Sequence, residues 1–400
     1  MIKKNKTDFG LYVLFPIFVA LYETSAYLSN DMYLPALPEI RRFLGVSVEQ
    51  AQDTLTMWFL GTCLFQLFVG PVSDKYGRRP ILFAGAGIFV LGCLISAVAE
   101  NIYLFNLGRF MQGFMVPTCL ITAYAILHEY FSTQKAIQVL AWMGSIIIIG
   151  PAIGPLLGSI ILMKAQWQII FYVLIICAVI PVLVLYKVMP ESQELSRDKP
   201  LNFKDIFGNY KQLVLNKQVV GYSLIFSFNI FAPIAWIVAG PFLVIETFHM
   251  SEADFGFIQL EVFGTYAAAC LVVNKISTKY DPFKLLKTGH KICIISSVSA
   301  VILSYIFIDN LKVITVMLIL ISVGNAFVLP VANRLSVESS RLPKSYVVSF
   351  FFMVIGLSTT FTSKFISEVF DFNIQEFCYL ILFVNLASQG LIILLSKSKK

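Results

Sequence analysis

The chain has 400 residues, of which 58% are hydrophobic and only 13% are charged, and its net charge is +7. A soluble globular domain usually carries about 25% charged residues, so this composition excludes an ordinary soluble protein. Long apolar runs recur from one end of the chain to the other and leave no room for a separate soluble domain. We therefore expect an integral membrane protein and no binding to nucleic acid.

Apolar segments long enough to cross a bilayer follow one another along the whole sequence. A transmembrane helix needs about 20 mostly apolar residues, and a membrane barrel would instead show alternating polarity. The sequence thus predicts an all-α membrane protein with twelve transmembrane helices. The predicted spans lie near residues 11–34, 52–72, 81–99, 103–127, 136–162, 168–188, 218–246, 255–275, 285–308, 312–337, 345–368 and 376–396.

The basic residues indicate how the chain is oriented in the membrane. If the N-terminus is cytoplasmic, all but six of the 30 Lys and Arg residues fall on the cytoplasmic side, as the positive-inside rule requires. Both termini are then cytoplasmic, and we expect a multi-pass protein of the bacterial inner membrane. The six exceptions are Arg41, Arg42, Arg109, Lys164, Lys312 and Lys364.

The longest polar stretch, residues 190–217, follows the sixth predicted span. It divides the chain into two six-helix halves, 1–189 and 218–400, joined by a cytoplasmic linker. Two such halves with a binding site between them near the bilayer midplane are typical of secondary transporters.

Several other classes of function lack their sequence signatures. No GxxxxGKS/T, HExxH or GxSxG pattern occurs, so we expect neither ATP-driven transport by this chain alone nor an enzyme. The seven cysteines lie in apolar runs without a CxxC pair, and the three histidines are scattered. We therefore expect no metal site and no cofactor.

The first predicted span contains two carboxylates, Glu23 and Asp31. An ionisable group at the centre of a membrane helix costs about 2.5–3.5 kcal/mol, so two in one span are hard to explain as lipid-facing residues. In a helix they would lie about 12 Å apart along the axis and about 80° apart in rotation. They could thus face one cavity at two depths, as a site for protons, ions or a charged ligand.

The fourth predicted span contains an arginine, in the run Gly108-Arg109-Phe-Met-Gln112-Gly113. A guanidinium within a span should face a polar interior or a carboxylate. The alternative is an interfacial Arg109 whose side chain reaches outward to the headgroups.

The loop after the second predicted span runs from Gly70 to Pro80 and contains Asp74, Gly77 and Arg78. Glycine permits a tight turn and close backbone approach, and Asp74 could accept hydrogen bonds from helix N-termini and from Arg78. The alternative is a plain basic loop that only fixes the topology.

The fifth predicted span carries glycines at every fourth position, Gly150, Gly154 and Gly158, together with Pro155. Small residues at this spacing line one helix face and allow another helix to approach closely. The proline removes a backbone donor and kinks the helix.

These motifs resemble those of the major facilitator superfamily. The loop from Gly70 resembles the signature G-x-x-x-D-R-x-G-R-R/K, with Lys75 in place of the first Arg, and the run from Arg109 is similar to the RxxQG motif. The fifth span resembles the motif G-x-x-x-G-P-x-x-G of antiporters. Residues 21–38 resemble the MdfA-type multidrug/proton antiporters and the related bicyclomycin/chloramphenicol resistance exporters.

The resemblance implies a proton-coupled exporter of small lipophilic or cationic compounds that works by alternating access and uses the proton gradient as its energy source. Partners would be protons, the small-molecule substrate and the lipid bilayer, and the chain would act as a monomer. A dedicated exporter or importer of one metabolite, such as a siderophore, is the alternative.

Roles for individual residues follow from the resemblance. It assigns gating to Gly70, Asp74, Gly77 and Arg78, and tight packing in an exporter to Gly150, Gly154, Pro155 and Gly158. Proton coupling or substrate binding falls to Glu23, Asp31, Arg109 and Gln112, with Arg109 tuning Asp31 by charge. The cavity wall would be aromatic, with Tyr27, Tyr124 and Trp236 as candidates.

Two charged residues of the second half depart from this pattern. Glu261 lies in the eighth predicted span and could be a further substrate or proton group; alternatively it lies at the outer rim. Lys364 should pair with Glu368, one helical turn away.

Overall fold

The computed structural model describes residues 13–131, 139, 143, 149–191, 203–277, 279–342, 344–371 and 373–397, and the regular secondary structure of these residues is entirely helical. By their contacts, the residues form two compact units. The first unit comprises Met1–Val46 and Met57–Leu201, and the second comprises Ser47–Thr56 and Asn202–Lys400. The beginning of one helix, α4, is thus grouped with the second unit although the rest of it belongs to the first.

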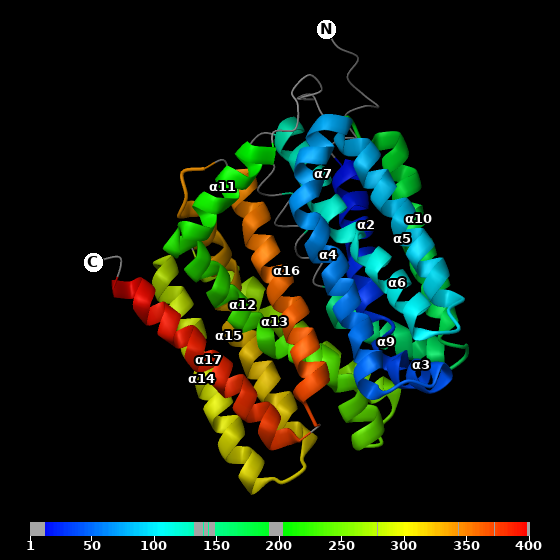
Figure 1. The fold of residues 1–400 in the computed structure, drawn as a ribbon. Helices are drawn as coiled ribbons and strands as arrows, with labels where there is room; N and C mark the ends of the chain where they lie inside the picture. Colours follow the sequence, from blue (N-terminus) through cyan, green and yellow to red (C-terminus); the bar gives the residue numbers. More distant parts are fainter. Residues whose placement is uncertain are drawn as a thin grey trace. The chain divides into compact units, whose positions relative to one another are not determined.

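The first unit is drawn from blue to green in Figure 1, and its helix α2 packs against α7, α9 and α10. Its helices are α2 (Phe15–Asp31), the 3₁₀ helix η2 (Leu34–Ala36), α3 (Leu37–Leu44), α4 (Val48–Tyr76), α5 (Arg78–Ala97), α6 (Ile102–Gly113), α7 (Met115–Tyr130), α9 (Ile149–Leu162) and α10 (Gln168–Val188).

The second unit is built around α12, which packs against α15, α16 and α17. Its helices are α11 (Phe203–Leu215), α12 (Lys217–Pro241), the π-helix η3 (Phe242–Thr247), α13 (Glu252–Ile276), α14 (Pro282–Ile306), α15 (Leu311–Glu338), α16 (Lys344–Val369) and α17 (Ile374–Lys397).

Each of the twelve predicted spans contains a helix. In the described part of the chain, nine helical stretches are long and apolar enough to cross a membrane, or ten if the bent α4 counts as one span. Helices α2 and α9 are shorter, and the predicted span 136–162 falls partly on residues outside the described ranges. An all-α multi-pass membrane fold is thereby confirmed.

Polar residues at the N-terminal caps set where several helices begin. The side chain of Asn101 accepts a hydrogen bond from the backbone of Leu104 at the start of α6, and Asn310 does the same for Lys312 at the start of α15. Ser251 forms a reciprocal capping box at the start of α13. Such caps satisfy backbone N–H groups that have no partner within the helix.

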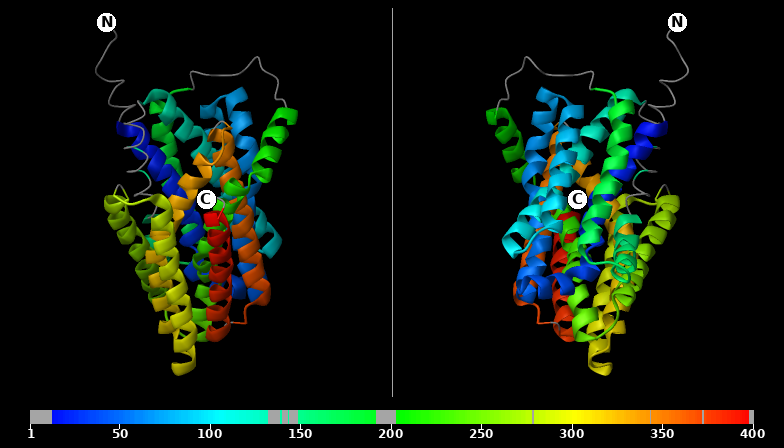
Figure 2. Two further views of the ribbon diagram at one scale, coloured as in Figure 1. Left: turned by 90° about the vertical axis from the view of Figure 1, so that its left-hand side faces the viewer. Right: turned by 90° about the vertical axis from the view of Figure 1, so that its right-hand side faces the viewer.

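Close helix crossings in both units depend on glycine. In the α14–α15 hairpin, drawn in yellow in Figure 2, a Cβ on Gly289 would lie 2.6 Å from the carbonyl oxygen of Gly324. In the first unit, a Cβ on Gly108 would lie 2.7 Å from the carbonyl oxygen of Gly92. Both contacts are too short for any larger residue, so these crossings position the side chains that α6 and α14 carry.

The structure differs from the predicted spans in three places. The first span ends at Asp31, and η2 and α3 follow it. The fourth span consists of two helices, α6 and α7, that meet at Phe114. Residues 203–215 of the predicted linker form α11, while 192–202 lie outside the described residues, so the linker itself stays a prediction.

Candidate functional site

Glu23 lies in the middle of α2, and its side chain is only 1% exposed. The phenol of Tyr124, on α7, donates a hydrogen bond of 3.0 Å to Glu23 Oε2. The sequence predicted both residues for this site but not their contact, which joins positions 101 residues apart. The carboxylate is thus buried and held by a neutral donor.

Asp31 is the last residue of α2 and is also 1% exposed. The side-chain nitrogen of Asn30 donates to its Oδ1 at 3.3 Å. A buried carboxylate needs compensation by a cation or by several donors. Arg109, in the same unit, interacts electrostatically with Asp31 and can fill that role.

Arg109 is completely buried, so its side chain does not reach outward to the headgroups. Its Nη1 donates 2.7 Å to the backbone carbonyl of Ser29 and also hydrogen bonds Gln112 Oε1. The guanidinium carbon lies 4.0 Å from the ring centroid of Tyr33, a cation–π distance. Arg109 therefore binds the end of α2, two residues before Asp31.

Gln112 fixes Arg109 from the other side. Its side-chain nitrogen donates to Ser96 Oγ at 2.9 Å and to the carbonyl of Gly92 at 3.2 Å, both on α5. Trp58 on α4 donates to Ser29 Oγ at 3.0 Å. The sequence did not predict that Ser29 binds Arg109, because the acceptor is its backbone carbonyl, which every residue type has.

The three glycines of α9 pack against α2 beside the acids. A Cβ added to Gly150 would lie 3.3 Å from Tyr27 Cβ, and one on Gly154 would lie 2.8 Å from Asp31 Cβ. On Gly158 it would lie 1.9 Å from the carbonyl oxygen of Met32. Pro155 lies inside the same helix. The glycine face thus brings α9 directly onto the part of α2 that ends at Asp31.

Gly70 and Asp74, predicted to lie in a loop, belong to α4, and Gly77 alone separates α4 from α5, whose first residue pairs with acids. Gly77 has φ of 104°, a conformation that favours glycine. Arg78 pairs with Asp74 at 3.5 Å and forms an ion pair with Glu129 at the end of α7. Gly70 lies further back in α4, where only Ile121 would come within 4 Å of an added Cβ.

A carboxylate from beyond α10 caps the start of α5. Glu191 Oε1 accepts hydrogen bonds from the backbone N–H of Arg78 at 3.0 Å and of Arg79 at 3.3 Å. Negative charge at a helix N-terminus is favourable. This contact could not be predicted from the sequence, in which Glu191 is marked only by its position just after the sixth predicted span.

The remaining predicted site residues divide between the units. Tyr27 and Tyr124 are half-buried in the first unit. Trp236, in the second, is fully buried and donates 2.7 Å to Gln259 Oε1 on α13. Glu261 lies on α13 with an exposed side chain, unlike the two acids of α2.

The second unit has a buried network of amide, hydroxyl and imidazole groups. Asn229 Oδ1 lies 3.2 Å from His290 Nδ1, and His290 Nε2 lies 3.1 Å from the carbonyl of Asn385. Asn325 donates 2.9 Å to the carbonyl of Asn229, whose usual helical donor would be the backbone nitrogen of Pro233, which carries no hydrogen. The network therefore satisfies α12 at its internal proline.

Within the described residues, no group of three His, Cys, Asp or Glu side chains is arranged to hold a metal ion. The chemistry available to the site in the first unit is therefore that of two buried carboxylates and a buried guanidinium. Such groups can bind and release protons and can bind charged or hydrogen-bonding ligands.

Comparisons with known proteins agree with this architecture. The Major Facilitator Superfamily matches residues 19–363. The multidrug transporter MdfA of Yersinia pestis bv. Antiqua is 31% identical over 279 residues, which cover 69% of this chain and 68% of that protein. MdfA of Escherichia coli O157:H7 is 30% identical over 279 residues, covering 69% and 67%.

Two solved structures share the fold at low identity. The crystal structure of a D-xylose–proton symporter has a TM-score of 0.74 at 15% identity, covering 96% of this chain and 97% of that one. A bacterial homologue of the human lysosomal transporter Spinster has a TM-score of 0.73 at 14% identity, covering 96% of each chain. With the family match over most of the sequence, the chain belongs to the Major Facilitator Superfamily.

Proposed function

We propose that this chain is a proton-coupled exporter of small lipophilic or cationic compounds. The single observation that carries the proposal is the burial of Glu23 and Asp31 on one helix, beside a buried Arg109. The relatives named multidrug transporters support the choice of cargo.

The chemistry of the site supports proton coupling. An ionised carboxylate away from water is costly, so burial favours its neutral, protonated form unless a cation offsets the charge. A bound cationic substrate and a bound proton are two ways to neutralise the same acids. Because both cannot be held at once, loading one releases the other, and opening the site to the two sides of the membrane in turn couples their fluxes.

The membrane potential supplies the driving force. A proton that moves inward gains about 2.3 kcal/mol for each 100 mV of potential. That gain can be used to move substrate outward. The proposed location is the inner membrane with both termini in the cytoplasm, so that the basic loops lie on the side where protons leave.

The test is efflux of a cationic dye, such as ethidium, from cells that express Glu23→Gln, Asp31→Asn and the double variant. We expect the double variant to lose proton-driven efflux completely. The matched control is Glu338→Gln, which neutralises an acid that is 48% exposed and pairs with Arg334, and it should transport normally. Full efflux by the double variant would overturn the proposal.

The breadth of cargo needs a second readout. Reconstituted protein should release protons when cationic, and not anionic, test compounds are added. Response to one metabolite alone, with none to lipophilic cations, would instead identify a dedicated transporter.

A further inference from the structure

One face of α14 is not covered by the described residues of the second unit. The helix packs mainly against α15 and α17 (Figure 1), and Gly289 and Cys293 lie on the buried side. The opposite side carries exposed residues at a spacing of three or four, all within about 80° of one another around the axis. We call them the α14 row: Lys284, Lys287, Lys291, Ile295, Val298, Ile302 and Tyr305.

The α14 row changes from charged to apolar along the helix. Its three lysines span about 10 Å of the axis, and the four large side chains from Ile295 to Tyr305 span about 15 Å. Half of the hydrocarbon core of a bilayer is also about 15 Å thick. Since α14 is long and apolar enough to cross a membrane, the row has the dimensions of one phospholipid, with a headgroup zone and an acyl-chain zone.

Lys291 is the member of the row that most needs an anion. It is the tenth residue of the 25-residue α14, about 14 Å from the first. An ammonium group at that depth on a lipid-facing surface is costly unless it extends toward the headgroups. Helix side chains tilt toward the N-terminus, which directs Lys291 back toward the level of Lys287. Its charge therefore joins those of the other two lysines.

Among the described residues, the protein provides no ion-pair partner for the three lysines. Lys287 Nζ lies 4.7 Å from the ring centroid of Phe283. Asp281 is the only acid in residues 275–291, and its Oδ2 accepts a hydrogen bond of 2.9 Å from the backbone N–H of Lys284. Three adjacent positive charges are thus left for a ligand from outside the protein.

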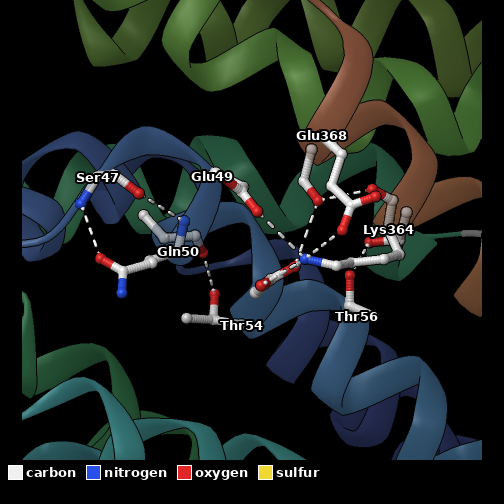
Figure 3. Close-up of polar contacts among 11 residues, drawn as sticks. Ser47, Glu49, Gln50, Thr54, Thr56, Lys364 and Glu368 are labelled. Carbon is white, nitrogen blue, oxygen red and sulfur yellow. Dashed lines mark hydrogen bonds and ion pairs between the residues drawn. The ribbon is translucent and has the colours of Figure 1, made fainter.

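Lys364, on α16, shows how the same unit neutralises an exposed lysine with its own acids (Figure 3). Its Nζ is 2.9 Å from Asp53 Oδ2, 3.4 Å from Glu49 Oε1 and 3.1 Å from Glu368 Oε1. The predicted pairing with Glu368 is confirmed, but the two acids of α4, more than 300 positions away, were not predicted. The lysines of the α14 row have no such set of acids.

We propose that the α14 row is a binding site for an anionic phospholipid. The phosphate of the headgroup lies among the ammonium groups of the three lysines, and an acyl chain lies along the apolar part of the row. A lysine at an anionic membrane surface contributes about a fivefold gain in affinity, which a headgroup without net charge does not provide. The site belongs to α14 alone and does not depend on the proposed transport function.

The test is photo-crosslinking of the full chain in phosphatidylcholine vesicles that contain a trace of phosphatidylglycerol with a diazirine at the end of one acyl chain. Peptide mass spectrometry locates the adducts. We expect them between Ile295 and Tyr305, at least about fivefold more abundant than with the same diazirine on phosphatidylcholine. Equal labelling of this segment by the two probes would overturn the proposal, because it would show contact with bulk lipid only.

The lysines are tested by replacing all three with Gln, which should reduce labelling by the anionic probe to the level of the phosphatidylcholine probe. Replacing all three with Arg keeps the charge and should preserve the labelling. The matched control removes the same charge from other exposed lysines, and it should label like the unchanged protein. Its substitutions are Lys164→Gln, Lys312→Gln and Lys364→Gln. Equal loss of labelling in the control and in the Gln variant of the row would overturn the proposal.

Competition identifies the source of the phosphate. Unlabelled phosphatidylglycerol or cardiolipin should displace the anionic probe from α14, and stronger displacement by cardiolipin would assign the site to a lipid with two phosphates. Inorganic phosphate should leave the labelling unchanged. Displacement by inorganic phosphate as effective as that by the lipids, or no displacement by either lipid, would overturn a site for a phospholipid.

Discussion

The two units bury polar groups in different ways. In the first, Glu23, Asp31 and Arg109 are ionisable, and the Nε and Nη2 atoms of Arg109 have no hydrogen-bond partner among the described residues. In the second, the network around Asn229 and His290 consists of amide, hydroxyl and imidazole groups that bind one another. Both lie where helices of one unit pack against each other.

The difference indicates that the buried polar groups of the two units serve different purposes. A buried polar network whose members are paired rigidifies the helices that carry it. Buried charges with spare hydrogen-bonding capacity are expensive and mark functional groups in membrane proteins. We therefore expect substitutions in the first site to impair transport more than stability, and substitutions in the second network to do the reverse.

The largest effect should come from Arg109→Met. Removing a buried charge partner leaves the remaining charge uncompensated at a cost of about 3–5 kcal/mol, so efflux should fall by at least about a hundredfold. Dye efflux and thermal unfolding in detergent measure the two effects. The control Arg334→Met removes an exposed pair, and equal efflux in the two variants would contradict a special role for Arg109.

The next largest effect should come from Gly158→Ala. The added Cβ would lie 1.9 Å from the carbonyl oxygen of Met32, so α9 must move away from α2, at about 3 kcal/mol for overpacking. Efflux and the unfolding temperature should both fall. Gly87→Ala in α5, where nothing lies within 4 Å, serves as the control and should lose neither.

Asn229→Ala tests the buried polar network of the second unit. It leaves His290 Nδ1 and Ser388 Oγ without this partner, and unpaired buried polar groups cost about 1–3 kcal/mol. The unfolding temperature should fall, while the number of protons moved per dye molecule stays the same. A changed proton-to-dye ratio would mean that the second unit also takes part in coupling.

The smallest effect should come from Tyr124→Phe, which removes the hydrogen bond to Glu23. The net loss of about 0.5–1.5 kcal/mol should lower efflux by up to about tenfold and leave the unfolding temperature nearly unchanged. Tyr103→Phe, at an 82% exposed position of α6, should not affect efflux. Equal efflux in both variants would show that the contact with Glu23 is not used.

The sequence predicted the helices well, because apolar runs are local patterns, while the roles assigned to the site residues stay predictions. Apolar runs marked every span, and charges within such runs identified Glu23, Asp31 and Arg109. The motif in α9 pointed to close packing, and the structure identifies α2 as the helix it contacts.

What the sequence did not predict depends on contacts between distant segments. The partners of Glu23, Arg109 and Lys364 are 101, 80 and more than 300 positions away. One error was avoidable: α3 begins with a proline at its first turn and ends at Gly45, which has φ of 63°. These are readable helix signals, and they indicate a separate short helix after the first span.

The end of α2 at Asp31 determines which helices can respond when Asp31 gains a proton. Because α2 stops there, the carbonyl of Ser29 accepts Arg109 directly. This acceptor is a backbone dipole, which no change of pH can remove. Arg109 therefore keeps an anchor whether Asp31 is charged or neutral. Protonation of Asp31 changes the charge of the site but does not require the arginine to move. A structural response to that proton must therefore pass through α2 and the glycine face of α9 that contacts it.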